Sequence, residues 1–489
     1  MNKKKLVSAI LYVLIVVSLF SGGQAAPDTA VVVGKNDGRF EAALNSEATA
    51  SGAETEAFSY SDKFTGTDGK IEFYIDVSDI EYSGNPMPVI RMTPEPLTVE
   101  KAKQISEVLF GDAKLYEDSG ELSKSELEDQ ILYYRQISSY DYIAHELEGL
   151  NGERSKDEIE AAIQSHMEAR LAILADLKEQ YEDAPDDAER QECRWTFYPA
   201  SHYALPGLEL TENEDKTKQI NAITEIEGVQ YLYWVNSRDA EDFRNHSINA
   251  FFDDRRLQEK IDAGIVEKLY HAEEPDEDQV EAVRRQVADM IERMDIGEWE
   301  ITYCETSYHK DREGYQIAIE ATPVYNGIAV TPQTQLANLK SEEEYASNYY
   351  YEQLSFRMGT EGELISFSYY GPLEVVDVVN ENTAVMSFDE LTDRIKAQLP
   401  MDDIGMYQVY ETIPTEKVVM MILYMEFGLS RTKIRDNPDD FYLVPSVTLR
   451  GSYLMYNESS ELIETGMEGV EQTLLVLNLV DGSVIHYAQ

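Results

Sequence analysis

Cysteine is almost absent from the 489-residue chain, which contains only Cys193 and Cys304. Two thiols are too few for a metal-binding cysteine cluster or for a disulfide-dense scaffold, so both of these kinds of structure are excluded. Two reduced, half-buried thiols are the simplest interpretation. A single disulfide between them is the alternative that an oxidising compartment would allow.

Positive charge is also scarce, because 41 lysines and arginines stand against 93 aspartates and glutamates, which gives a net charge of −52. Such a surface repels polyanions, which argues against nucleic acid as a partner and against adsorption to anionic lipid or wall polymers. Cationic peptides and calcium are compatible with this charge. A surface adapted to solubility is the plainer explanation.

The chain lacks the familiar catalytic motifs: it has no G-x-S-x-G elbow, no phosphate-binding loop and no glycine-rich dinucleotide fingerprint. His145 and Glu146 begin like a zinc-protease helix, but Gly149 stands where the second histidine belongs. The seven histidines are scattered, and no pair has metal-ligand spacing on one predicted element. We therefore name no catalytic, cofactor-binding or metal-ligating residue, and we expect no cofactor.

Acidic residues are too numerous to select a site by sequence alone. The segment RDNPDDFY, with Asp436, Asp439 and Asp440, resembles a calcium loop but lacks the ligand pattern of one, which favours a solvated turn. Paired carboxylates for glycoside hydrolysis remain an open alternative, because 93 acidic residues offer many pairs and only geometry selects among them.

Only one long apolar run is present, at residues 6–20, between Lys3, Lys4 and Lys5 and the small residues that end at Ala26. These are the three parts of an export signal, and the run is shorter than the roughly 20 residues of a membrane span. We predict a signal peptide over residues 1–26, cleaved near Ala25. An uncleaved membrane tether is the alternative, and both place the protein outside the cell or on the outer face of the cytoplasmic membrane.

The remaining sequence predicts an α+β protein of two or more domains, in which helices pack on antiparallel sheets and an αα-hairpin is inserted. Period-two alternation predicts strands at residues 70–82 and 228–237, and the 12 residues of VVMMILYMEFGL read as a buried strand. Apolar stripes with capping residues predict helices over 98–111, 276–294 and 387–398. The expected regions are a flexible spacer at 27–60, an N-terminal α+β region with the helical hairpin at 61–185, a middle α+β region at 186–296 and a C-terminal antiparallel sheet domain with a helix at 297–489.

Several finer features are expected from local motifs. Capping-box spacing at Ser125–Glu128 and Ser155–Glu158 predicts the starts of the two hairpin helices, which meet at Asn151–Gly152. Hairpin turns are expected at Asn326–Gly327, Glu361–Gly362 and Asp481–Gly482. The 32 tyrosines include SNYYYEQLSF and FSYYG, where an exposed sheet face could bind a sugar, peptide or protein, although packing within the sheet is the commoner role.

A family resemblance follows from the export signal together with VVVGKNDGRFEAAL, FTGTDGKIEFYIDVSDIEYSGNPMPVIRMTPEPLTVEKAKQI, FYLVPSVTLRG and LLVLNLVDGSVIH. These segments resemble exported lipoproteins of unknown function from Gram-positive gut bacteria, over most of the chain. Such proteins carry a lipid-modified cysteine, whereas Gly23 stands at the matching place here, so the resemblance does not extend to lipid attachment at this position. The C-terminal half is similar to the PepSY and YycH/YycI-like groups, which implies modulation of a membrane kinase or protease.

Taken together, these observations predict an exported, non-enzymatic cell-surface protein that binds a partner or ligand, in envelope sensing or regulation. The expected partner is a membrane or cell-surface protein. The alternative is an extracellular hydrolase that uses paired carboxylates.

Overall fold

The computed structural model describes residues 39–46, 48, 56–66, 69–118, 123–140, 142–144, 156–186, 190–202, 217–240, 243–254, 257–331, 352–400, 416–434, 437–457, 459, 462–465 and 472–487. The predicted signal peptide, the His145–Glu146 pair, the Asn151–Gly152 turn, Ser155 and Asp436 lie outside these ranges. The tyrosines of SNYYYEQLSF lie outside them as well.

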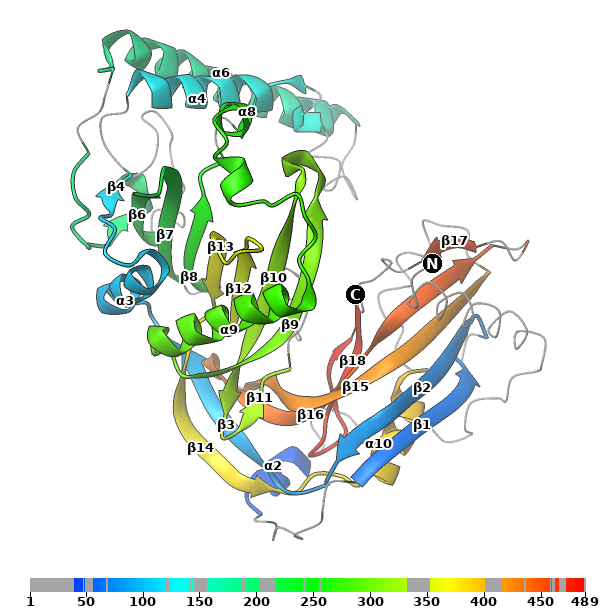
Figure 1. The fold of residues 1–489 in the computed structure, drawn as a ribbon. Helices are drawn as coiled ribbons and strands as arrows, with labels where there is room; N and C mark the ends of the chain where they lie inside the picture. Colours follow the sequence, from blue (N-terminus) through cyan, green and yellow to red (C-terminus); the bar gives the residue numbers. More distant parts are fainter. Residues whose placement is uncertain are drawn as a thin grey trace. The chain divides into compact units, whose positions relative to one another are not determined.

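The protein has an α+β fold with two large sheets, as the sequence predicts (Figure 1). The chain divides into two compact units that are not consecutive in sequence. Unit 1 comprises residues 1–93, 325–347 and 374–489, and unit 2 comprises residues 94–324 and 348–373. These divisions differ from the three consecutive regions expected above, because a parallel pairing of strands far apart in sequence joins the two ends of the chain within unit 1.

The first sheet runs in the order β1-β2-β15-β16-β18-β19, with β3, β14 and β17 attached beside this path. Its described strands are β1 (Glu56–Thr65), β2 (Ile71–Tyr82), β3 (Met87–Pro94), β14 (Leu373–Thr383), β15 (Lys417–Ile434), β16 (Asn437–Tyr456), β17 (Leu462–Thr465), β18 (Gln472–Asn478) and β19 (Val484–Tyr487). The long β15–β16 hairpin is antiparallel, whereas β15 pairs with β2 in parallel.

Two helices cover opposite faces of the first sheet, because successive side chains of a strand point to opposite sides. Helix α10 (Phe388–Gln398) packs through Leu391 and Ile395 against one face, which includes Leu475 and Leu477. Helix α2 (Arg39–Leu44) packs on the other face, which includes Val476. Helix α2 lies within the stretch that was expected to be a flexible spacer, and its apolar side chains dock it to the sheet.

The second sheet runs in the order β11-β10-β12-β13-β8-β7-β6-β4, with β5 paired to β6 and β9 paired to β10. Its described strands are β4 (Tyr116–Glu117), β5 (Tyr198–Pro199), β6 (Thr217–Ile226), β7 (Val229–Ala240), β8 (Phe243–Phe252), β9 (Glu298–His309), β10 (Gly314–Tyr325), β11 (Ile328–Ala329), β12 (Gln353–Met358) and β13 (Leu364–Tyr370). Its associated helices are α3 (Val99–Phe110), α4 (Lys124–Ile137), α6 (Lys156–Asp183), α8 (Leu257–Asp262) and α9 (Glu277–Met294), with short 3-10 helices η1 (Ala200–His202), η2 (Val266–Lys268) and η3 (Lys310–Arg312).

The core of unit 2 forms where α3 and α9 pack on the second sheet (Figure 1). The predicted apolar face of β7 is buried against this layer, and it consists of Val229, Tyr231, Tyr233 and Val235. The Tyr233 hydroxyl is fully buried and donates a hydrogen bond to the Ala102 carbonyl of α3, 2.6 Å away. This contact fixes α3 on the sheet while satisfying a buried polar group.

The predicted αα-hairpin is present as α4 and α6, which lie side by side (Figure 1). The Tyr181 hydroxyl of α6 donates to the Glu128 carboxylate of α4 at 2.6 Å. The predicted capping box of α4 is wrong by two residues: Ser123 is the N-cap, and its partner is Glu126. Both serines precede a glutamate by three residues, so burial of Ser123 and docking of the helix decide between them.

Other local predictions agree with the structure. Thr98 caps the start of α3, Asp276 that of α9 and Ser387 that of α10. Positive φ angles at Gly327, Gly362 and Gly482 are consistent with the three predicted hairpin turns. In the described part of the chain, no helix is both long enough and apolar enough to cross a membrane.

Candidate metal centre

A tight turn between β12 and β13 brings two glutamates together in unit 2. The turn has the sequence Gly359-Thr360-Glu361-Gly362-Glu363. The Gly359 amide donates to the Glu363 carbonyl at 2.7 Å, and the Gly362 amide donates to the Gly359 carbonyl at 3.1 Å. These two hydrogen bonds close the turn and hold the backbone that carries both carboxylates.

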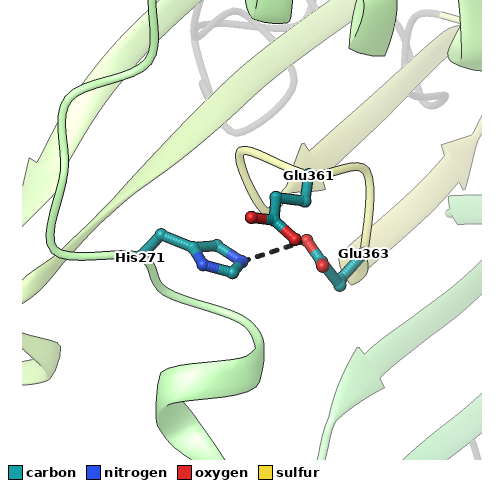
Figure 2. A group of neighbouring side chains, drawn as sticks. All are labelled: His271, Glu361 and Glu363. Atoms are coloured by element: carbon teal, nitrogen blue, oxygen red, sulfur yellow. Dashed lines mark ion pairs between the residues drawn. The ribbon is translucent and has the colours of Figure 1, made fainter.

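His271 reaches the same point from a different part of the chain, just after η2 (Figure 2). Leu269 and Tyr270 are buried in the core, and the Tyr315 amide of β10 donates to the His271 carbonyl at 2.8 Å. The imidazole is therefore supported by a backbone that is fixed to the sheet. Figure 2 shows its ring directed at the two carboxylates.

The three side chains converge closely enough to hold a metal ion. One ligand atom of each of His271, Glu361 and Glu363 lies within 4.8 Å of the other two. The His271 Nε2 and Glu363 Oε2 atoms are 3.4 Å apart. Both atoms are shielded from solvent, yet neither has a hydrogen-bond partner among the described residues. Because buried polar atoms are normally satisfied, this pair calls for an explanation.

A shared metal ion would explain the separation of this unsatisfied pair. Two ligands at about 2.1 Å from a tetrahedral ion lie about 3.4 Å from each other. The observed distance between His271 Nε2 and Glu363 Oε2 is 3.4 Å. Direct attraction between these side chains requires a protonated imidazole, whereas a metal ligand must be a neutral imidazole.

Gly359 permits the close approach of the turn to the segment that carries His271. A Cβ atom at this position would lie 2.4 Å from Glu363 Oε2 and 2.7 Å from the Leu269 carbonyl oxygen. No side chain fits at those distances. The absence of a side chain at residue 359 therefore allows the Glu363 carboxylate to lie beside His271.

The surroundings of the site combine burial with one nearby phenol. The Tyr231 hydroxyl donates to the Leu364 carbonyl at 2.7 Å, next to Glu363 in the chain. Burial raises the pKa of Tyr231 strongly, and the negative charge of Glu363 adds to that increase. Tyr231 therefore stays neutral and acts as a hydrogen-bond donor, not as an anionic ligand.

The chemistry of this donor set points to a divalent ion of the first transition row. Imidazole nitrogen suits zinc, iron, copper and nickel, while carboxylate oxygen also suits manganese, magnesium and calcium. A mixed set of one imidazole and two carboxylates is therefore suited to zinc or manganese. Three protein ligands leave at least one coordination position for water or another ligand.

A hollow of about 620 Å³ adjoins the same turn, between α3, α9 and the β12–β13 hairpin. Gly362, which separates the two glutamates, is part of its lining. The Gln286 side-chain amide of α9 donates to the Gly362 carbonyl at 2.8 Å, so α9 holds the turn from the side of the hollow. The lining consists of Val108, Leu109, Ala282, Arg285, Gln286, Asp289, Met290, Arg293, Met358, Gly362 and Leu364.

The calcium-like segment and the two cysteines considered in the sequence analysis take no part in this site. Asp440 of the calcium-like segment pairs with Arg91, whose Nε donates to Asp440 Oδ2 at 2.8 Å. Burial alone would raise the pKa of Asp440, but hydrogen bonds from Arg91, Thr93 and Asn437 lower it overall. Cys193 is buried, Cys304 is half-buried, and both are free thiols.

Sequence reasoning missed the convergence of His271 with the two glutamates. The search for metal-ligand spacing considered pairs of histidines on one predicted helix or strand, whereas His271 lies about 90 residues before the turn that carries the two glutamates. The one local signal was the Glu-Gly-Glu triplet in a predicted hairpin turn, since such a turn directs neighbouring carboxylates into a small volume.

Comparison with known proteins assigns no family to this chain. No protein-family model matches it, and no curated protein matches it. A crystal structure of an uncharacterized protein from Eubacterium rectale is similar with a TM-score of 0.38 and 9% sequence identity, and the match covers 92% of this chain and 99% of that chain. A likeness at this level assigns neither fold nor activity.

Proposed function

We propose that this chain is an exported, non-enzymatic binding protein, and that unit 2 binds a divalent transition-metal ion through His271, Glu361 and Glu363. The carrying observation is the half-buried His271–Glu363 pair, in which the solvent-shielded Nε2 and Oε2 atoms lie 3.4 Å apart without hydrogen-bond partners among the described residues. Glu361 is exposed and gives the ion a route from solvent.

Chelation accounts for this geometry better than hydrolysis by paired carboxylates. Glycosidases place their two carboxyl groups on either side of the bond to be cleaved, about 5–9.5 Å apart. Glu361 and Glu363 come from one turn, and both point toward the His271 imidazole (Figure 2). One oxygen of each carboxylate and one imidazole nitrogen lie within 4.8 Å of one another.

Isothermal titration of the chelator-stripped, full-length chain with zinc, manganese and calcium tests the metal proposal. We expect binding of zinc or manganese with a stoichiometry of one, and loss of that binding in His271→Ala and Glu361→Gln. Glu361 is exposed, so its replacement tests the site without disturbing the core. His166→Ala is the matched control, because His166 is exposed on α6.

The outcome that contradicts the proposal is equal metal binding by the wild-type chain and the His271→Ala variant, with both folded by circular dichroism. Calcium binding alone would also count against it, because imidazole is a poor ligand for that ion.

The proposal of an exported location and of a membrane or cell-surface partner is based on the sequence. Crosslinking on intact cells, followed by mass spectrometry of the partners and of the N-terminal peptide, tests both. Repeated capture of a membrane kinase, protease or transporter would support a regulatory role at the envelope. Recovery of the protein alone from the medium would count against such a role.

A further inference from the structure

Strand β14 forms an edge of the first sheet, beside β3 (Figure 1). Within the described part of the chain, β14 pairs only with β3, which pairs with β16 on its other side. An edge strand presents a row of backbone N–H and C=O groups that no neighbouring strand uses, so another extended segment can add to it. The 11 residues of β14 are therefore a template for one further strand.

The first half of β14 is exposed on both faces. Residues 374–378 are all exposed, and the exposed fractions of Val375, Val376 and Val378 are 48%, 45% and 38%. Successive side chains of a strand point to opposite faces of the sheet, so neither face is covered at this place. Three large apolar side chains thus contact water within a run of five residues, and clustered exposed apolar groups mark interaction sites.

Helix α2 covers the second half of β14. Val379 packs in the apolar cluster that contains Phe40 and Leu44 of α2. The Asn380 side-chain amide donates to the Leu44 carbonyl at 3.2 Å and to the Ser46 carbonyl at 2.9 Å. The segment that remains open on this strand is therefore residues 374–378.

Other edges of the first sheet carry features that hinder pairing. Strand β1 is also paired on one side only, but it contains Lys63 and its pairing with β2 shifts register between Phe58 and Tyr60. Strands β17 and β19 have four residues each. Lysine, bulges and short length are common means of protecting a sheet edge. The sequence of β14, LEVVDVVNENT, has neither lysine nor proline, and its four valines favour extended backbone.

The charged side chains of β14 are all acidic. Glu374, Asp377 and Glu381 are exposed, and the strand contains no lysine or arginine. On the neighbouring β3, a hydrogen bond to Asp440 raises the pKa of Arg91, and the negative charges of Asp440 and Asp377 add to that increase. This arginine therefore already serves two carboxylates, and a segment that adds to β14 gains most if it brings its own cations.

A second copy of this chain is a poor occupant of the edge. Pairing of β14 with β14 would set two acidic strands side by side and bring together two chains that each have a net charge of −52. Like charges on paired strands are destabilising. A basic segment, by contrast, is attracted both by the strand and by the whole chain.

We propose that residues 374–378 of β14 capture an extended segment of a partner protein in which apolar residues alternate with lysine or arginine. The segment adds to the first sheet as a further strand, with its apolar side chains beside the valines and its cations beside Glu374 and Asp377. This inference rests on the proposed role as a binding protein and names the chemistry of the partner. It uses no residue of the metal site.

Titration of the full-length chain with three synthetic peptides, at low ionic strength, tests the proposal. In antiparallel alignment, TVKVVKT sets its lysines beside Asp377 and Glu374 and its valines beside Val375, Val376 and Val378. TVEVVET reverses the charge of this peptide, and TVKPVKT keeps the charge but lacks one backbone donor. We expect TVKVVKT to bind about tenfold more tightly than either of the other two.

Hydrogen exchange locates the bound peptide. Addition of TVKVVKT should slow the exchange of backbone amides within residues 374–378, because amides at the open edge become hydrogen-bonded. Exchange within residues 56–65, the other long edge strand of the sheet, should not change.

Charge reversal on β14 assigns the contact. Asp377→Lys should weaken binding of TVKVVKT about three- to tenfold and strengthen binding of TVEVVET, because an attractive cross-strand pair becomes repulsive. Glu81→Lys is the matched control, since Glu81 is an exposed residue of β2 in the same unit and the change in charge is equal. A thermal unfolding curve verifies that both variants are folded. Zinc titration of Asp377→Lys should match the wild type, so failures of the two proposals are separate results.

The proposal is overturned if TVKVVKT does not bind at about 1 mM, or if it binds no better than TVEVVET. Equal loss of affinity in Glu81→Lys and Asp377→Lys also overturns it, because the effect would be one of general charge. A dimer that Asp377→Lys dissociates would identify a second copy as the occupant instead. Crosslinking of the same cell-surface partner by wild type and Asp377→Lys would overturn this inference while leaving the proposed function in place.

Discussion

Replacement of Gly359 by alanine tests the geometric basis of the metal site. The added Cβ would lie 2.4 Å from Glu363 Oε2 and 2.7 Å from the Leu269 carbonyl oxygen. Gly359 does not have a positive φ angle, so the substitution tests space alone. The Leu269 oxygen belongs to the backbone of a buried segment, so the turn and the Glu363 side chain must move instead.

The size of the effect follows from these distances. A Cβ approaches an oxygen no closer than about 3.0 Å, so Glu363 Oε2 must shift by several tenths of an ångström or more. Metal-ligand distances are fixed within about 0.2 Å. We therefore expect zinc affinity to fall about 10- to 100-fold, as for other losses of ligand support. Overpacking should also lower the free energy of unfolding by about 1–3 kcal/mol.

Gly297→Ala provides the control for this variant. Gly297 lies in unit 2 with φ +101°, and no described atom lies within 4 Å of a Cβ built on it. We expect a loss of about 1–2 kcal/mol in unfolding free energy from backbone strain, with unchanged zinc affinity. Calorimetry and urea unfolding measure the two quantities. If Gly359→Ala binds zinc as tightly as Gly297→Ala does, the proposed ligand geometry is wrong.

Other expected outcomes concern acid stability and thiol chemistry. Hydrogen bonds from Arg194 lower the pKa of Glu117, so this pair stabilises the fold above about pH 4.3. The stabilisation is lost as the pH falls through the lowered pKa of Glu117. Urea unfolding should show that Glu117→Gln is about 1–2 kcal/mol less stable than the wild type at pH 7, with a smaller difference at pH 3. Burial raises the pKa of Cys193 and of Cys304, so iodoacetamide should label both slowly at pH 7.5 and fast after unfolding without reductant, whereas a disulfide would block the second reaction.

Much of the local secondary structure could be predicted from the amino-acid sequence. Alternation of apolar residues predicts the buried face of β2, since Ile71, Phe73, Ile75 and Val77 are all buried. Side-chain periodicity and capping are properties of neighbouring residues, so they need no knowledge of the rest of the fold. The predicted position of the α4 capping box was wrong because two equivalent motifs overlap, Ser123–Glu126 and Ser125–Glu128. Only packing distinguishes them.

The sequence by itself therefore determined the α+β class, the positions of β2, β7, α3, α9 and α10, the hairpin turns and the acidic character of this protein. Tertiary structure alone decided that β2 pairs with β15 and that α2 docks on the first sheet. It also brought His271 to Glu361 and Glu363, and α9 to the Gly362 turn. These contacts join segments far apart in the chain, and they depend on which buried faces fit together, which no local pattern of residues specifies.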